Sequence, residues 1–582
     1  MKFRTFVSTL LAVVFVLLTL GIGGFWKLTA QTPLSLLKGG GQAAPSAAIF
    51  VPKQAPVMVS LLVNPDRLAF LRRVLVWPGA RRRARAEIDQ IERVLLAKTG
   101  LTYSEDIQPW LGEEVTFAVT APDIDRDLSN GEQPGYLLVL TSKDGVRAKD
   151  FIQLFWQKRA MAGADLVFEQ YSGVKLIYGG RQQPSVGARN DRSDNLGGDA
   201  FSVDRLASAV VGDRFILFAN EPAVLRQAVN AVQVADLNLD SSRSYQRALE
   251  TLSVNPLGVV FINFPQLTAW LGDAAGGANA AALSPDESAG FEHALFGLTV
   301  NRRGLLADTA LVTAAGEAQQ PIRPVFSAPV EALQHMPKEA ALAAAGSDLS
   351  QTWQSLLQGA RSYPAMAAWL RQIENGIQAK WGLSPSESIF PVLTGEYALG
   401  MVPYPDPASP DWIFVVQRDG NVDAAIESLD ALAQDQGLSV TPLTLSGREV
   451  SAWTTIATAQ SATDKMRLQT KVEGLYTQIG DYELFATSVA AMDLALKIQD
   501  NSLLDSARFQ QAIAPLSPNN DGVLYLDWPI VKALVEEKAP LVKFLELGGQ
   551  PFFNHLDSLA ISSYGGDVSR REGGIFLRLA DR

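Results

Sequence analysis

The sequence predicts an α+β protein: two tandem copies of one mainly antiparallel sheet unit with helices on one face, preceded by a single N-terminal transmembrane helix. One observation is a repeat, because residues 90–111 and 372–393 align without a gap and share 12 of 22 residues. A second is a series of short apolar runs joined by tight turns, without regular strand–helix–strand alternation. A third is an uncharged stretch of 22 residues near the N-terminus. Self-similarity of this kind indicates the architecture before any single residue is considered.

The N-terminal stretch predicts a signal anchor over residues 1–27. Thr5–Trp26 carries no charge, and as a helix it would span about 33 Å, enough to cross a hydrocarbon core of roughly 30 Å. Lys2 and Arg4 favour a cytoplasmic N-terminus, with the bulk of the chain in the periplasm or thylakoid lumen. The alternative is a cleaved signal peptide, whose apolar region is usually shorter. Residues 28–48, rich in Gly, Ala, Ser and Pro, predict a flexible tether.

Each copy is predicted to contain short strands interspersed with helices. The strand patterns of the two copies match in order and cover residues 57–63, 115–119, 136–140 and 294–312 in the first, and 341–346, 397–402, 412–416 and 557–580 in the second. The helical patterns cover 147–162 and 221–233 in the first copy, and 422–436 and 488–498 in the second. Gly212-Asp213 and Gly480-Asp481 lie between apolar runs and predict hairpin turns. In both copies a strand is followed by a Pro at the start of a helix, within 257–271 and 521–535.

The two copies are predicted to span residues 49–312 and 331–582. The segment between them, 313–330, contains Pro and Gly with little periodicity and predicts a linker. A covalent duplication can behave as a fused dimer, which would place a groove between the halves.

The segments that follow the predicted anchor resemble a known family. Ala48–Pro56 reads AIFVPKQAP, and Leu62–Leu68 reads LVNPDRL. In these segments the chain is similar to an uncharacterised family of membrane-anchored proteins of cyanobacterial type, catalogued as a domain of unknown function. The resemblance would cover most of the chain. It implies a membrane context and no known activity.

The composition excludes several classes of site. The net charge is −11 and no long basic tract is present, so sequence-independent binding of nucleic acid is disfavoured. The chain has no cysteine, which excludes disulfides, thiolate catalysis and cysteine-ligated zinc. Its three histidines, His293, His335 and His555, lie far apart and outside any zinc-binding pattern. Nucleophile-elbow, P-loop and dinucleotide-binding motifs are also missing from the sequence, so no cofactor is predicted.

A pair of glutamates gives the only catalytic candidates. Glu113 and Glu396 each follow a Gly in corresponding turns of the two copies. A paired-carboxylate hydrolase would use them as acid and base. The interpretation that we favour is that each carboxylate accepts backbone N–H bonds in a turn or faces water.

Three aspartates give the metal candidates. Asp123, Asp125 and Asp127 alternate as the oxygen ligands of a calcium loop do. Leu128 and Pro134 occupy the positions where such a loop requires Gly and Glu, so an EF-hand is excluded. A looser cation site is less expected than an acidic, solvated loop.

A cluster of arginines is the most unusual charge feature of this acidic chain. It comprises Arg72, Arg73, Arg81, Arg82, Arg83 and Arg85. Its closeness in sequence to the predicted anchor suggests contact with anionic lipid head groups. The alternative is a solvated helix face that pairs with Glu87, Asp89 and Glu92.

These observations favour a membrane-tethered, extracytoplasmic, non-catalytic binding or scaffolding protein with a protein partner. Two alternatives stay open. One is a carrier of a lipid or other hydrophobic ligand, which requires a continuous apolar cavity. The other is a hydrolase with carboxylates at the interface of the two halves. The oligomeric state is not readable from the sequence.

Overall fold

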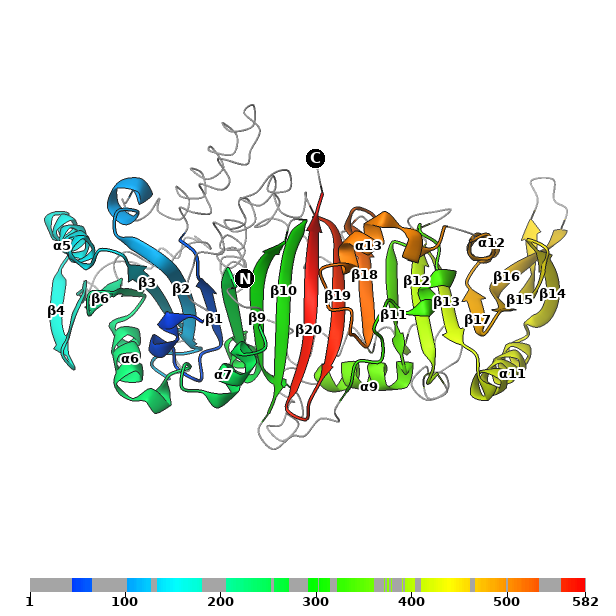
Figure 1. Ribbon diagram of the computed structural model, residues 1–582, viewed down its shortest axis with the longest axis horizontal. Coiled ribbons are helices and arrows are strands. Elements are labelled where there is room, and N and C mark those ends of the chain that lie inside the picture. The colour runs from blue at the N-terminus through cyan, green and yellow to red at the C-terminus, as the bar shows by residue number, and fades with distance from the viewer. Residues whose placement is uncertain are drawn as a thin grey trace, which may run out of the picture. The chain divides into compact units, whose positions relative to one another are not determined.

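In the computed structural model the chain forms two compact units (Figure 1). The first comprises the described residues up to 314, and the second those from 322 to 580. The structure describes isolated positions between 371 and 390 and the residues 44–64, 102–126, 133–180, 206–252, 256–271, 291–301, 303–314, 322–360, 393–403, 410–460, 466–498, 501–532 and 556–580.

The first unit is built on an antiparallel sheet. Its strands are β1 (Val57–Leu61), β2 (Leu111–Ala121), β3 (Gly135–Ser142), β4 (Leu166–Tyr171), β5 (Val174–Gly179), β6 (Ala207–Val211), β7 (Phe215–Ala219), β8 (Gly258–Asn263), β9 (Phe291–Asn301) and β10 (Gly304–Thr313). They pair in the order β10-β9-β8-β1-β2-β3-β7-β6-β5-β4. Sheet neighbours are therefore often distant in sequence.

The second unit repeats this strand order. Its strands are β11 (Leu342–Ser347), β12 (Glu396–Val402), β13 (Asp411–Gln417), β14 (Ser439–Leu445), β15 (Arg448–Gln460), β16 (Met466–Ile479), β17 (Tyr482–Ala486), β18 (Gly522–Asp527), β19 (Leu556–Gly566) and β20 (Arg570–Leu579). They pair in the order β20-β19-β18-β11-β12-β13-β17-β16-β15-β14, again antiparallel throughout. Each β-strand of one unit thus has a counterpart at the same place in the other.

Helices join the strands in both units, several of them at corresponding places. In the first they are η1 (Ser46–Phe50), η2 (Tyr103–Ile107), α5 (Gly145–Met161), α6 (Pro222–Gln233), η4 (Ala235–Leu237), α7 (Arg243–Leu249) and α8 (Phe264–Leu271). In the second they are η8 (Glu331–His335), α9 (Leu349–Ala360), α11 (Gly420–Asp435), α12 (Val489–Leu496), η11 (Leu503–Asp505) and α13 (Ala507–Ile513). Asp144 and Asp419 are the N-cap residues of α5 and α11, and their side chains accept hydrogen bonds from backbone N–H groups of the first helical turn.

The prediction of a mixed, mainly antiparallel α+β fold is confirmed, but the prediction that helices cover one face of the sheet is wrong. In the first unit α5 packs against Leu140 and Ile216, whereas α6 packs against Leu137 and Leu217. Neighbouring residues of a strand point to opposite faces, so α5 and α6 cover opposite faces of the same sheet. The run YLLVL at 136–140 is apolar on both faces because both are buried.

The predicted hairpins are confirmed. Gly212 and Gly480 adopt φ values of 60° and 58° in the turns that join β6 to β7 and β16 to β17. Positive φ is readily adopted by glycine, which lacks Cβ, so these residues suit tight turns between paired strands.

Two predicted boundaries need correction. Ala47 and Ala48, at the end of the predicted tether over 28–48, are buried in η1. Ile322 and Phe326, inside the predicted linker over 313–330, form β-bridges with Gly566 and Asn520. At these described residues the backbone N–H groups bond within the fold, that of Ala47 to Glu114 and that of Ile322 to Gly566.

The predicted localisation as a single-pass membrane protein also needs correction. Within the described ranges no helix combines the length and the apolar character needed to cross a lipid bilayer. The predicted anchor over residues 1–27 lies outside the described residues.

Candidate functional site

A carboxylate, buried in the first unit and partly buried in the second, holds the first helix of each unit. Glu114, which is fully buried on β2, accepts hydrogen bonds from the backbone N–H groups of Ser46 and Ala47, each at 2.9 Å. In the second unit, Glu396 on β12 accepts a hydrogen bond from the backbone N–H of Ala332 at 3.2 Å. Because η1 and η8 begin at these N–H groups, each carboxylate satisfies donors that the short helix leaves unpaired.

The strand registers show that the predicted pair Glu113 and Glu396 are not counterparts. Val115 pairs with Leu140 on β3, and Tyr397 pairs with Val416 on β13, so Val115 and Tyr397 occupy corresponding places in the two sheets. The residues before them, Glu114 and Glu396, therefore also correspond. The β2–β3 register shifts between Leu111 and Val115, where Glu113 lies. The gap-free alignment of 90–111 with 372–393, extended by three residues at the same offset, also places Glu114 opposite Glu396, whereas the match of Gly112-Glu113 to Gly395-Glu396 shifts it by one residue.

The metal candidates do not assemble into a site within the part of the chain that the structure describes. Asp123 accepts a hydrogen bond from the backbone N–H of Gln133 at 3.1 Å, closing the loop after β2. No group of three or more His, Asp or Glu side chains able to hold a metal occurs among the described residues. Asp125 is in the same described loop. Asp127 lies outside the described residues, as do the predicted lipid-contact residues Arg72, Arg73, Arg81, Arg82, Arg83 and Arg85.

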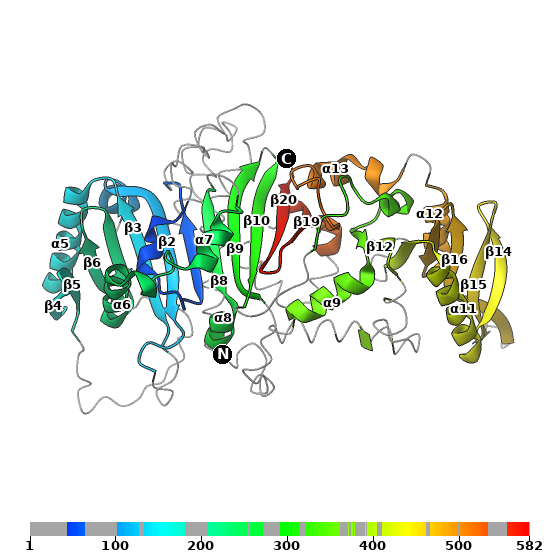
Figure 2. The ribbon, with the colours of Figure 1, turned by 60° about the horizontal axis from the view of Figure 1, so that its bottom comes forward.

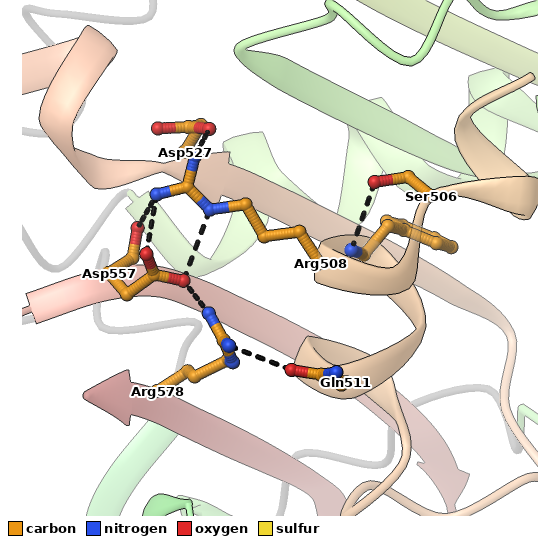
Figure 3. Close-up of polar contacts among 7 residues, drawn as sticks. Ser506, Arg508, Gln511, Asp527, Asp557 and Arg578 are labelled. Atoms are coloured by element: carbon orange, nitrogen blue, oxygen red, sulfur yellow. Dashed lines mark hydrogen bonds and ion pairs between the residues drawn. The ribbon is translucent and has the colours of Figure 1, made fainter. Parts of the chain in front are cut away.

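A compact ionic cluster occurs in the second unit (Figure 3). The carboxylate of Asp557 lies between the guanidinium groups of Arg508 and Arg578, and it bonds to both. Arg508 also bonds to Asp527, and Arg578 bonds to Gln511 at 2.7 Å. Burial raises the pKa of Asp527, although Arg508 favours its ionised form.

The chemistry of this cluster favours a structural role. Two guanidinium groups face two carboxylates, so their charges balance, and the bonds tie α13 to β18, β19 and β20. Partly buried ions require such pairing because water no longer solvates them fully. No local sequence pattern indicates the cluster, since its residues lie on four elements, from Arg508 to Arg578.

The exposed face of α5 is the candidate interaction surface. Leu154 and Met161 are 46% and 80% exposed, and they lie on one helix face with Arg147 and Lys158. The spacing 147, 154, 158, 161 follows the helical repeat and places the four side chains in one stripe. We call these four residues the α5 surface. The neighbouring side of α5, which carries Ala148, Ile152 and Phe155, packs onto the sheet.

The counterparts of the α5 surface can be found from the contacts of the two helices with their sheets. Trp156 of α5 donates a hydrogen bond to Ser208 at 2.7 Å, and Asp430 of α11 accepts one from Tyr476 at 2.6 Å. Ser208 and Tyr476 occupy corresponding register positions, because they pair with Phe218 and Phe485. Trp156 and Asp430 are therefore counterparts.

Counting from these two residues shows how far the helix surfaces differ. Arg147, Leu154 and Met161 correspond to exposed residues of α11 that are polar or acidic, namely Asn421, Ser428 and Asp435, whereas Lys158 corresponds to the partly buried Leu432. Sequence reasoning missed this difference, because it treated both segments only as helical patterns. The signal is present in the sequence as apolar and basic residues recurring along α5 beyond those that the core needs.

Comparison with known proteins identifies the family. Residues 10–579 match the family described as "Protein of unknown function (DUF3352)", so the chain belongs to this family. This confirms the resemblance to a domain of unknown function; the match does not show the membrane-anchored, cyanobacterial-type character that the resemblance implied. No curated protein matches the chain.

Two solved structures of TP0453 are similar to parts of the chain. Crystal form I is 9% identical, with a TM-score of 0.21, over 48% of this chain and 82% of that chain. Crystal form III is 11% identical, with a TM-score of 0.22, over 50% of this chain and 90% of that chain. Likeness at this level carries no argument about fold or function.

Proposed function

We propose that this member of the DUF3352 family is a non-catalytic binding or scaffolding protein that holds a protein partner on the α5 surface. The observation that carries the proposal is the exposure of Leu154 and Met161 beside Arg147 and Lys158. Exposed apolar side chains that cluster within a polar rim are typical of surfaces that bind proteins. Arginine and methionine are also enriched at such interfaces.

We infer that the two units arose by duplication of one unit, so that α11 can serve as the reference for the α5 surface. The equal strand order of the units supports this inference. If α11 keeps what the shared scaffold requires, then Asn421, Ser428 and Asp435 show that polar residues suffice at these positions. The shared scaffold therefore does not require apolar or basic residues at these three positions of α5, although Arg147 also pairs with the N-cap residue Asp144.

The chemistry of the α5 surface indicates the kind of partner. Arg147 and Lys158 are basic residues in a chain whose net charge is −11. A partner with acidic side chains around an apolar centre would complement both features, and opposite charges would speed its approach. Binding should weaken as salt rises, since exposed charges are screened over about 10 Å at 0.1 M.

The hydrolase and the carrier are less well supported. A hydrolase that used Glu396 would need a carboxylate available to substrate, but this carboxylate is bonded to Ala332 and to the hydroxyl of Tyr482. A lipid carrier would need a continuous apolar cavity. The apolar residues on the two sheet faces of the first unit instead pack against helices, as Phe155 and Leu225 illustrate.

Photo-cross-linking from the helix surface tests the proposed function. A photoreactive phenylalanine analogue would replace Met161 in one version of the chain and its counterpart Asp435 in another, each made in the native cell. We expect a discrete adduct with another protein from position 161 and none from position 435. The double variant Arg147→Glu, Lys158→Glu should lose the adduct, because its charges repel an acidic partner.

Two outcomes would overturn the proposal. One is a chain with no adduct at position 161. The other is the same set of adducts from positions 161 and 435, which would show contact without specificity.

A further inference from the structure

The outermost hairpins of the two units have the same kind of turn but differ in the residues of their edge strands. β4 and β5 are joined by Ser172-Gly173, with φ values of 46° and 83°, and β14 and β15 by Ser446-Gly447, with φ values of 49° and 78°. Such turns, with both central residues at positive φ, fix the register of a hairpin.

The strand residues directly before the two turns are Tyr171 and Leu445. Three residues before them lie Phe168 in the first unit and Pro442 in the second. These two residues occupy the same place on β4 and β14. Pairing opposite Phe168 is Ile177, and opposite Pro442 is Ser451.

The turn geometry also determines which backbone groups face away from the hairpin. Tyr171 and Val174 flank a two-residue turn and exchange hydrogen bonds, so alternate residues of β4 counted from Tyr171 bond to β5. Phe168 therefore directs its N–H and C=O outward. Among the described residues β4 pairs only with β5, and β14 only with β15.

Within the described part of the chain the outer edge of β4 has no paired strand, whereas proline blocks that of β14. Pro442 has no N–H to offer at the outward position, and proline on an edge strand prevents another strand from adding. Phe168 retains its N–H and exposes 59% of its surface. An exposed aromatic residue beside unpaired backbone groups is the arrangement that β-strand addition uses.

We propose that a second copy of this chain adds to the outer edge of β4, so that two β4 strands pair antiparallel about a twofold axis through Phe168. This proposal concerns the edge of β4 and is independent of the partner held on the α5 surface. Figure 2 shows α5 beside β4 and β5 in the first unit, so the two surfaces are neighbouring but distinct.

The sequence of β4 suits pairing with itself. A twofold axis makes two copies of one strand antiparallel, which is the direction of every described strand pair within both units. Phe168 would meet its own copy, and aromatic cross-strand pairs are favourable. Leu166 would face Gln170 and Val167 would face Glu169, so no like charges lie directly opposite.

Charge and closure support the same arrangement. Glu169 is already matched by Arg226, whose Nε and Nη2 bond to it at 2.8 and 2.7 Å. Both chains use the same edge, that of β4, so the contact is self-complementary and the association stops at a dimer. Pro442 prevents the corresponding edge of the second unit from extending it.

The absence of native cysteine allows a direct test by cross-linking. Phe168→Cys and Gln170→Cys each introduce a single thiol, and both proteins would be oxidised mildly at equal concentration. About the proposed axis, the Cα atoms of two residues 168 lie about 5.5 Å apart, within reach of a disulfide. Two residues 170 lie about 14 Å apart, which is too far.

We expect Phe168→Cys to give a covalent dimer and Gln170→Cys to remain a single chain. Wild-type protein should sediment with the mass of two chains, and Phe168→Pro, which copies the residue of the second unit, with the mass of one. Circular dichroism would confirm that the Pro variant is folded. A monomeric wild type, a dimeric folded Phe168→Pro, or equal cross-linking of both cysteine variants would each overturn the proposal.

Discussion

At the scale of single residues, the buried His293 makes a pH-dependent contribution to stability. It is 6% exposed on β9, and its ring packs edge-on against Phe261 with centroids 5.3 Å apart. Burial lowers the pKa of His293 from 6.5 to about 4. The unfolded chain therefore binds more protons than the folded chain between these values, so stability is lost as the pH falls from 6.5 toward 4.

The variant His293→Gln should remove this dependence. Between pH 6.5 and pH 4 the wild type should lose about 3 kcal/mol more stability than the variant, since each pH unit across the shift corresponds to about 1.4 kcal/mol. Urea unfolding at several pH values measures the difference. The comparison with the variant is needed because Glu292, whose pKa burial raises, acts in the opposite direction. Parallel pH profiles for the two proteins would contradict the expectation.

Glu113 and Glu114 show what sequence could predict at the residue scale. The expectation that Glu113 and Glu396 accept backbone N–H bonds holds for Glu396, and in the first unit Glu114 accepts such bonds. The choice of Glu113 was wrong, because two consecutive glutamates differ only in which face of the strand they occupy. The offset of the gap-free repeat already places Glu114 opposite Glu396, and the local match of the two Gly-Glu pairs pointed to the neighbouring residue instead.

At the scale of elements, the ionic cluster fastens α13 to the sheet of the second unit. Asp557 is the shared acceptor, and its side chain is 13% exposed. Asp557→Asn would remove the charge that Arg508 and Arg578 share. We expect the free energy of unfolding to fall by about 2–4 kcal/mol, because breaking a buried ion pair leaves a charge uncompensated. Arg508 is 35% exposed, so water partly solvates it and the loss is smaller than for a fully buried pair.

Urea unfolding and hydrogen exchange of the α13 backbone measure this effect. Asp567→Asn is the control, since the side chain of Asp567 is 56% exposed and lies 3.9 Å from Arg570. The control should change stability by no more than about 0.5 kcal/mol. An equal loss in the two variants, or unchanged exchange of α13 in Asp557→Asn, would argue against the cluster as a fastening.

Elements were more predictable than their arrangement. The helices predicted over 147–162 and 422–436 are α5 and α11, because capping aspartates and helical periodicity are local signals. The distribution of helices over two faces was missed. It depends on which strands become neighbours, and β3 pairs with β2 and β7, the second of which lies more than 70 residues away.

At the scale of the whole molecule, the sequence repeat pointed to two similar units, and the equal strand orders support duplication as an inference. The order of strands within each unit was beyond the sequence, because β1 sits between β2 and β8, which are separated by a long span of chain. The α5 surface was missed for a different reason. It becomes visible only when α5 is compared with α11 at positions matched through the sheet.

Replacing the α5 surface with its counterpart residues tests the central claim most directly. The triple variant Arg147→Asn, Leu154→Ser, Met161→Asp carries the residues of α11 at three exposed positions. Its melting temperature should match that of the wild type, because these side chains lie outside the core. Once the cross-linked partner is purified, calorimetric titration should show that the triple variant binds it at least about tenfold more weakly, as expected from losing about 1.4 kcal/mol or more. Wild-type affinity in a fully folded triple variant would contradict the account.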